Sequence, residues 1–76
     1  MQEKIAALLK EINDKDDVKD FNLNLFENDM LDSLGIAQLV ASMEETFQIE
    51  IDPEDILPEN FSTINEISAL VEKYKR

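Results

Sequence analysis

Apolar residues recur at helical spacing in three stretches of the chain. In the first stretch they fall at i, i+3, i+4 and i+7, which predicts an amphipathic helix from Gln2 to Ile12. A second helix is predicted from Ser33 to Phe47, with its apolar stripe at Ile36, Leu39, Val40, Met43 and Phe47. A third begins after a capping residue at Ser62 or Thr63, and its buried face is Ile64, Ile67, Leu70, Val71 and Tyr74.

The 20 residues from Asn13 to Asp32 show no clear period. A loop of this length inside a compact domain is unusual. It carries five apolar side chains that can dock into a core, namely Val18, Phe21, Leu23, Leu25 and Phe26. We therefore expect an ordered loop that crosses from the first helix to the second. The alternation from Phe21 to Leu25 resembles a strand, but no second strand is evident to pair with it.

A short helix is predicted between the second and the last long helix. Asp52 is a typical N-cap residue and Pro53 suits the first helical position, whereas Pro58 disfavours helical geometry in the residue before it. The short helix should therefore span Pro53 to Leu57. Together these elements predict an all-α four-helix bundle, with three main helices, a short third helix and a long first loop, in a single domain over residues 1–76.

The chain contains neither cysteine nor histidine. Disulfides, thiolate metal sites, cysteine nucleophiles and a Ser-His-Asp relay are therefore excluded within this chain. A domain of 76 residues also has a modest core and little room for an internal active site. We predict that the protein is not an enzyme and has no catalytic residues of its own.

Neither of two acidic stretches fits a calcium-binding loop. Counting from Asp14, the fifth loop position is Val18, and counting from Asp52 it is Ile56, so the required oxygen ligands are missing. No metal site is predicted. No apolar run approaches the length of a membrane span, and the N-terminal apolar run is too short for a signal peptide. A cytoplasmic protein is the simplest expectation.

The net charge of −11 is unevenly distributed. Residues 20–72 contain thirteen acidic residues and no Lys or Arg. Such a field repels nucleic acid and anionic lipid and attracts basic protein surfaces. A solubilising acidic face is the alternative interpretation, but 53 residues without a cation favour a basic partner surface. Repulsion between like-charged copies favours a monomer.

Asp32-Ser33-Leu34 places a hydroxyl at the predicted start of the second helix. The N–H groups at a helix start lack intrahelical partners and carry the positive end of the macrodipole, so a phosphate on Ser33 would be stabilised there. Asp32 or Ser33 is equally suited to cap the helix. On the tripeptide alone, the capping role is the more common of the two.

Leu34, Ala37 and Ala41 lie off the apolar stripe of the second helix, between Ser33 and the acidic pair Glu44 and Glu45. An exposed leucine beside small residues could receive a partner helix. Single exposed apolar residues are also normal on protein surfaces. The spacing alone does not separate these two interpretations.

The long loop, the Asp-Ser-Leu sequence at the start of an acidic helix and the short third helix together resemble acyl and peptidyl carrier proteins. The resemblance covers essentially the whole chain. It implies that Ser33 bears 4′-phosphopantetheine, attached by a phosphopantetheinyl transferase, and that the terminal thiol of this arm holds a thioester-bound cargo. It further implies that Asp32 and Leu34 are recognised by the transferase. Loading ligases and downstream transferases would dock on the second helix, including Glu44 and Glu45.

Within that family, the chain looks most similar to D-alanyl carrier proteins of lipoteichoic acid modification. The similar segments are Asp16 to Lys19, Asn22 to Glu27 and Leu31 to Gly35, where Gly35 replaces the polar residue usual in fatty acid carriers. The chain departs from that branch at Asp29-Met30, where Gly-Leu is usual, and at Ile56-Leu57-Pro58 and Phe61. The cargo therefore stays open between a fatty acyl, polyketide, aminoacyl or D-alanyl group. A non-carrier acidic interaction module is the alternative of another class.

Overall fold

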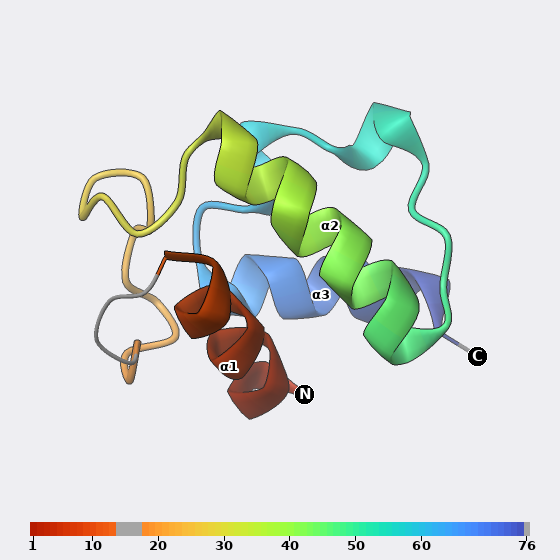
Figure 1. Cartoon of the computed structure of the whole chain (residues 1–76), viewed down its shortest axis with the longest axis horizontal. Coiled ribbons are helices and arrows are strands. Elements are labelled where there is room, and N and C mark those ends of the chain that lie inside the picture. Colours follow the sequence, from red (N-terminus) through yellow and green to blue (C-terminus); the bar gives the residue numbers. More distant parts are fainter. Residues whose placement is uncertain (14–17, 76) are drawn as a thin grey trace.

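The computed structural model describes residues 1–13 and 18–75 and is helical (Figure 1). No strand occurs in these two described ranges, so the all-α prediction is confirmed. The elements are α1 (Gln2–Asn13), α2 (Ser33–Phe47), the 3-10 turns η1 (Pro53–Asp55) and η2 (Pro58–Asn60), and α3 (Ile64–Tyr74). The predicted second helix has the predicted bounds, and α1 extends one residue beyond its predicted end.

The α1 helix packs against both α2 and α3, and α2 crosses over α3 in Figure 1. The molecule measures 30 × 21 × 19 Å. Its core includes two fully buried side chains each from α1 and α2, three from α3, and others from the connecting segments. The fully buried side chains are Ile5, Leu9, Leu25, Leu39, Met43, Phe61, Ile64, Ile67 and Val71. Most belong to the predicted apolar stripes, whereas Leu25 and Phe61 come from connections.

The short helix predicted over Pro53 to Leu57 is not a single helix in the structure. Asp52 caps the turn as predicted, because its carboxylate accepts a hydrogen bond from the Glu54 N–H at 2.8 Å. Regular structure then stops at Asp55, and Leu57 is extended with φ −118° and ψ 146°. The physical reason is Pro58, which excludes helical geometry at Leu57 and starts η2 instead. The five residues are therefore too few to propagate an α-helix.

The loop before α2 is held by the start of α3. The Leu25 N–H donates to the Ser62 carbonyl at 2.7 Å, and the Asn65 N–H donates to the Phe21 carbonyl at 3.1 Å. The Asn65 side-chain amide also donates to Asn22 Oδ1 at 2.8 Å. These bonds, together with complete burial of Leu25, fix residues 21–25 without a partner strand. Residues 14–17 of the predicted loop lie outside the described residues.

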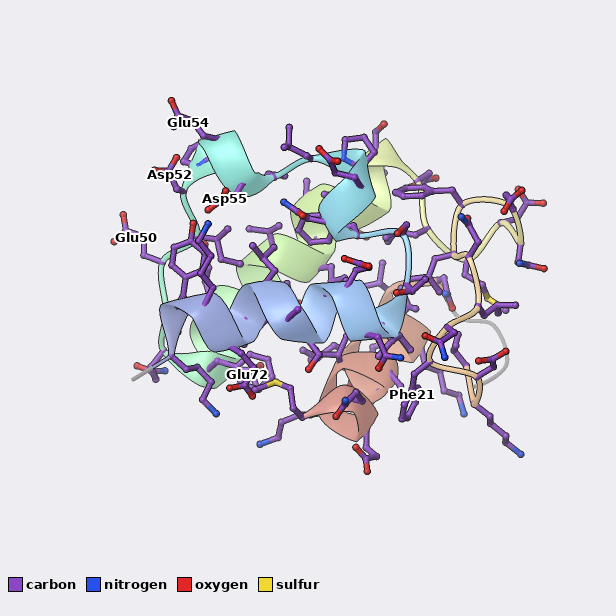
Figure 2. All side chains as sticks on the ribbon, turned by 180° about the vertical axis from the view of Figure 1, so that it is seen from behind. Phe21, Glu50, Asp52, Glu54, Asp55 and Glu72 are labelled. Carbon is purple, nitrogen blue, oxygen red and sulfur yellow. The ribbon has the colours of Figure 1, made fainter. Side chains whose placement is uncertain are left out.

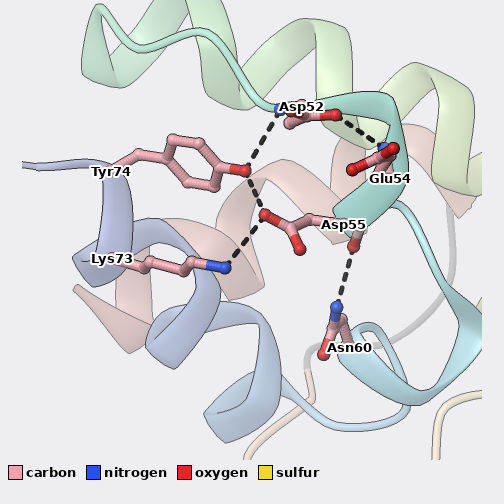
Figure 3. A network of polar contacts seen from close by, with 6 residues as sticks. All are labelled: Asp52, Glu54, Asp55, Asn60, Lys73 and Tyr74. Atoms are coloured by element: carbon pink, nitrogen blue, oxygen red, sulfur yellow. Dashed lines mark hydrogen bonds and ion pairs between the residues drawn. The ribbon is translucent and has the colours of Figure 1, made fainter.

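A polar network joins the α2–α3 connection to the end of α3 (Figure 3). The Tyr74 hydroxyl donates to the Asp55 carboxylate and accepts from the Asp52 N–H at 3.2 Å. Lys73 Nζ lies 3.1 Å from the same Asp55 oxygen. Figure 2 shows Asp52 and Asp55 among the labelled acidic residues at one end of the molecule. The contacts of Lys73 and Tyr74 thus stabilise this turn, in which the neighbouring acidic residues would otherwise repel one another.

The network shifts the pKa values of its members in opposite directions. The hydrogen bond from Tyr74 and the contact with Lys73 lower the pKa of Asp55. The hydrogen bond to Asp55 raises the pKa of both Lys73 and Tyr74. Asp55 therefore adds stability above the ordinary aspartate pKa of 3.8, and that stability is lost as the pH falls through its lowered pKa. The contribution of Lys73 and Tyr74 is lost as the pH rises through their raised pKa values.

We therefore expect Asp55→Asn to lower the melting temperature most between about pH 5 and pH 9, with a smaller difference from wild type at either extreme. Thermal unfolding followed by circular dichroism across this range measures the effect. The matched control is Glu54→Gln, because Glu54 is an exposed acid in the same turn whose side chain is outside the network. A difference for Asp55→Asn that is flat with pH would contradict the network's role.

Candidate functional site: the start of the second helix

Asp32 caps α2 and leaves Ser33 as the first helical residue. The Asp32 backbone is extended, and its Oδ1 accepts a hydrogen bond from the Gly35 N–H at 2.7 Å. Its carbonyl accepts from the Ile36 N–H at 2.8 Å. Because Asp32 supplies the cap, the Ser33 hydroxyl is not needed for this purpose, and the Ser33 side chain is exposed. Of the two residues that the sequence offered as the cap, the structure therefore shows Asp32 in this role.

The backbone around Ser33 is suited to a bound phosphate. The N–H groups of Ser33 and Leu34 have no hydrogen-bond partner in the described part of the chain, since the Asp32 cap serves Gly35 and Ile36. Both N–H groups lie at the positive end of a 15-residue helix. A phosphodiester on Ser33 would accept from such donors without displacing the cap. The donor set therefore fits the phosphate end of a phosphopantetheine arm.

Gly35 is tightly packed at this helix start. It is buried, and a Cβ atom built on it would lie 3.0 Å from Leu31 Cδ1 and 3.2 Å from Asp32 Oδ1. A larger residue would press on the capping carboxylate and on the loop side chain that precedes it. The sequence suggested Gly35 as a marker of the cargo. In the structure, Gly35 instead allows Leu31 and Asp32 to pack closely at the helix start that positions Ser33.

The chain reaches Ser33 through a tightly bonded turn. The Met30 N–H donates to the Leu25 carbonyl at 2.8 Å, and the Asn13 side-chain amide donates to the Met30 carbonyl at 2.9 Å. Asp29 has φ 56°, in the left-handed region that favours glycine. A glycine would adopt this conformation without strain. Aspartate tolerates the conformation better than most residues.

The candidate partner residues differ in their surroundings. Leu34 is 68% exposed, and Ala37, Ala41 and Glu45 are also exposed on α2. Glu44 is half-buried, and its carboxylate accepts a hydrogen bond from the Ile51 N–H at 2.9 Å. The structure thus brings Leu34, Ala37, Ala41 and Glu45 to the surface of one helix. It ties Glu44 to the chain that leaves this helix, which the sequence did not reveal.

The described residues contain no group of three or more acidic, His or Cys side chains that could hold a metal ion. No helix in the described part of the chain is long and apolar enough to cross a membrane. The acidic cluster at the far end of the molecule surrounds the turn that Lys73 and Tyr74 hold (Figures 2 and 3). The start of α2 is therefore the best-defined candidate site in the structure.

Comparison with known proteins identifies the family of this chain. The family model described as phosphopantetheine attachment site matches residues 2–71. The D-alanyl carrier protein of Lactococcus lactis subsp. lactis (strain IL1403) is 30% identical over 76 residues, covering 99% of this chain and 96% of the relative. The D-alanyl carrier protein of Abiotrophia defectiva is 32% identical over 74 residues, covering 96% and 94%. That of Lacticaseibacillus casei (strain BL23) is 36% identical over 70 residues, covering 91% and 86%.

Carrier proteins hold a 4′-phosphopantetheine arm covalently and move groups bound to its thiol between enzymes. Such an arm explains how a chain without cysteine takes part in thiol chemistry. The family match covers nearly the whole chain. The chain therefore belongs to the phosphopantetheine-attachment family and is a carrier protein that bears 4′-phosphopantetheine, most similar in its branch to D-alanyl carrier proteins.

Proposed function

We propose that Ser33 is the attachment residue. The single observation that carries this assignment is the exposed Ser33 at the start of α2, where the N–H groups of Ser33 and Leu34 have no hydrogen-bond partner among residues 1–13 and 18–75. In the transfer step, the Ser33 hydroxyl oxygen forms a bond to the phosphorus of coenzyme A that carries the pantetheine. The phosphoanhydride bond breaks, the nucleotide part leaves, and the hydroxyl proton passes to a base of the transferase. This chain supplies the nucleophile and a positively polarised helix end.

The proposed cargo is a D-alanyl group bound as a thioester to the arm. This assignment is supported by the relatives, which are D-alanyl carrier proteins matched over nearly their whole length. A separate ligase would load the group, and a later enzyme would remove it. The carrier itself would have no catalytic activity. Residues 1–76 would act as a single monomeric domain in the cytoplasm, with η1 and η2 taking the place of the short third helix of a four-helix carrier bundle.

Mass spectrometry of the protein isolated from its native host tests the cargo. The expected spectrum shows one phosphopantetheine on Ser33, and a fraction of molecules carries an additional alanyl group that hydroxylamine removes. Hydroxylamine cleaves a thioester and leaves the phosphodiester intact. Chiral analysis of the released amino acid then identifies its hand. A fatty acyl or polyketide group on the arm would overturn the D-alanyl assignment and leave the carrier role in place.

We further propose that the exposed face of α2 docks on basic surfaces of partner enzymes. The face comprises Leu34, Ala37, Ala41 and Glu45, and Asp32 lies at its edge. Its support is the 68% exposure of Leu34 beside small residues and the absence of Lys and Arg from residues 20–72. An apolar centre with a charged rim is the usual composition of a protein interface. Glu44 would contribute charge while it holds Ile51.

Substitutions of two adjacent glutamates on α2 should distinguish an effect on partner docking from an effect on stability. We expect Glu44→Ala to lower the free energy of unfolding by about 1–2 kcal/mol, because the Ile51 N–H loses a charged acceptor. Glu45→Ala should leave stability within about 0.5 kcal/mol but raise the KM of a phosphopantetheinyl transferase, most at low salt. Urea unfolding and transferase kinetics measure the two effects. Equal stability losses, or no change in KM for Glu45→Ala, would contradict this division of roles.

A further inference from the structure

A groove of about 410 Å³ lies beside the proposed attachment residue. Its walls come from the end of α1, the last residues of the loop and the first turns of α2, three segments that meet at one end of the molecule in Figure 1. The residues that matter for its chemistry are Ile12, Asn13, Met30, Asp32, Leu34 and Gln38. The volume lies near the lower end of the range of about 300–1,000 Å³ that is typical of ligand pockets.

The groove adjoins the point where the arm would start. Asp32 and Leu34, the two residues that flank Ser33, both line it. A group esterified to Ser33 would therefore begin at the rim of the groove. Because the arm is covalently attached, its effective concentration at the groove is in about the millimolar range or above, so even weak contacts would populate a docked state. A free ligand has no such advantage.

The composition of the groove suits a pantetheine arm, in which apolar segments alternate with amide groups. Met30 and Leu34 offer apolar contacts for its methyl-bearing and methylene segments. Gln38 is exposed and its amide makes no hydrogen bond in the described part of the chain, so it can both donate to and accept from the amides of the arm. No Lys or Arg lines the groove, whereas Asp29 and Asp32 do. The local field therefore favours a neutral or cationic group over an anionic one.

We propose that this groove is an intramolecular binding site for the phosphopantetheine arm and a short polar cargo on its thiol. The inference rests on the attachment to Ser33 proposed above. It adds that the arm binds in this groove while the carrier is not bound to a partner enzyme. Gln38 positions the amides of the arm, and Met30 and Leu34 cover its apolar parts. The groove is open and partly polar, so it does not suit a long hydrocarbon chain, which needs an enclosed apolar surface. A small aminoacyl group meets these conditions.

The absence of cysteine allows a direct test, since the thiol of the arm is then the single thiol in the protein. A nitroxide attached to this thiol should selectively broaden the backbone amide signals of Asn13, Met30 and Gln38 in NMR spectra. The unlabelled apo and holo proteins should differ in chemical shift at the same residues. The expected broadening is at least about twofold greater there than at Ala7, which lines a separate cleft on α1. Even broadening, or broadening centred at Ala7, would overturn the proposal.

Matched aromatic substitutions on α2 provide a second test. Gln38→Phe fills the groove and should reduce the selective broadening at Asn13 by half or more. Thr46→Phe places the same ring at an exposed position of α2 outside the groove and should leave the broadening unchanged. Unchanged broadening in Gln38→Phe would contradict the proposed binding site. If no arm can be attached at all, the mass of the protein reports this first, and the proposed function fails instead of the groove.

Discussion

Ser33→Ala is expected to abolish loading completely. Wild-type protein incubated with coenzyme A and a broad-specificity phosphopantetheinyl transferase should gain the mass of one phosphopantetheine, whereas Ser33→Ala should gain none. The physical reason is that alanine lacks the oxygen that forms the phosphodiester, while the Asp32 cap and the helix start remain. Intact-protein mass spectrometry measures the result. Circular dichroism should show the same helical content in both proteins, because Ser33 is exposed and does not cap α2.

The other serines provide matched controls. Ser42 is half-buried in the middle of α2, where the backbone N–H groups are engaged within the helix. The Ser62 hydroxyl donates to the Glu59 carbonyl at 3.3 Å, and Ser68 is buried. Ser42→Ala and Ser62→Ala should therefore load like wild type. A mass gain that persists in Ser33→Ala, or disappears in Ser42→Ala with the fold intact, would contradict the assignment.

Leu25→Ala should have the largest effect on stability among substitutions in the loop before α2. Leu25 is fully buried although it lies in a connection, and its N–H donates to the Ser62 carbonyl at 2.7 Å. Removing a buried leucine side chain costs about 2–5 kcal/mol, because apolar contacts are lost and a cavity remains. A domain of this size has about 4–11 kcal/mol of stability in total. We therefore expect the melting temperature to fall by at least about 8 °C.

Leu57→Ala is the matched control, because Leu57 also lies in a connection but is 41% exposed. It should lower the free energy of unfolding by less than about 1 kcal/mol. Chemical unfolding of both variants, followed by circular dichroism, measures the difference. Equal losses would show that Leu25 does not join the loop to the core. At temperatures where both variants are folded, both should accept phosphopantetheine at Ser33, which separates stability from loading.

The sequence predicted those elements whose signal is local. The bounds of α2 followed from its apolar stripe and from Asp32, and the Thr63 cap of α3 is confirmed by a hydrogen bond from the Glu66 N–H at 3.0 Å. Residues 53–57 were misassigned because Pro58 acts at Leu57 and divides the segment into two turns. The N-cap preference at Asp52 was read correctly. A cap, however, specifies where a helix starts and not how far it continues.

By itself, the sequence determined the helical class, the acidic field, the absence of thiol and imidazole chemistry, and Ser33 as the residue to test. Each depends on residue type or on spacing along one helix. Only the tertiary structure decided what Glu44, Gly35, Leu25 and Gln38 do. Glu44 holds Ile51, Gly35 makes room for Leu31, Leu25 bonds to Ser62, and Gln38 lines a groove with Asn13. These roles depend on residues from separate segments meeting in space, and no local pattern along the chain encodes such meetings.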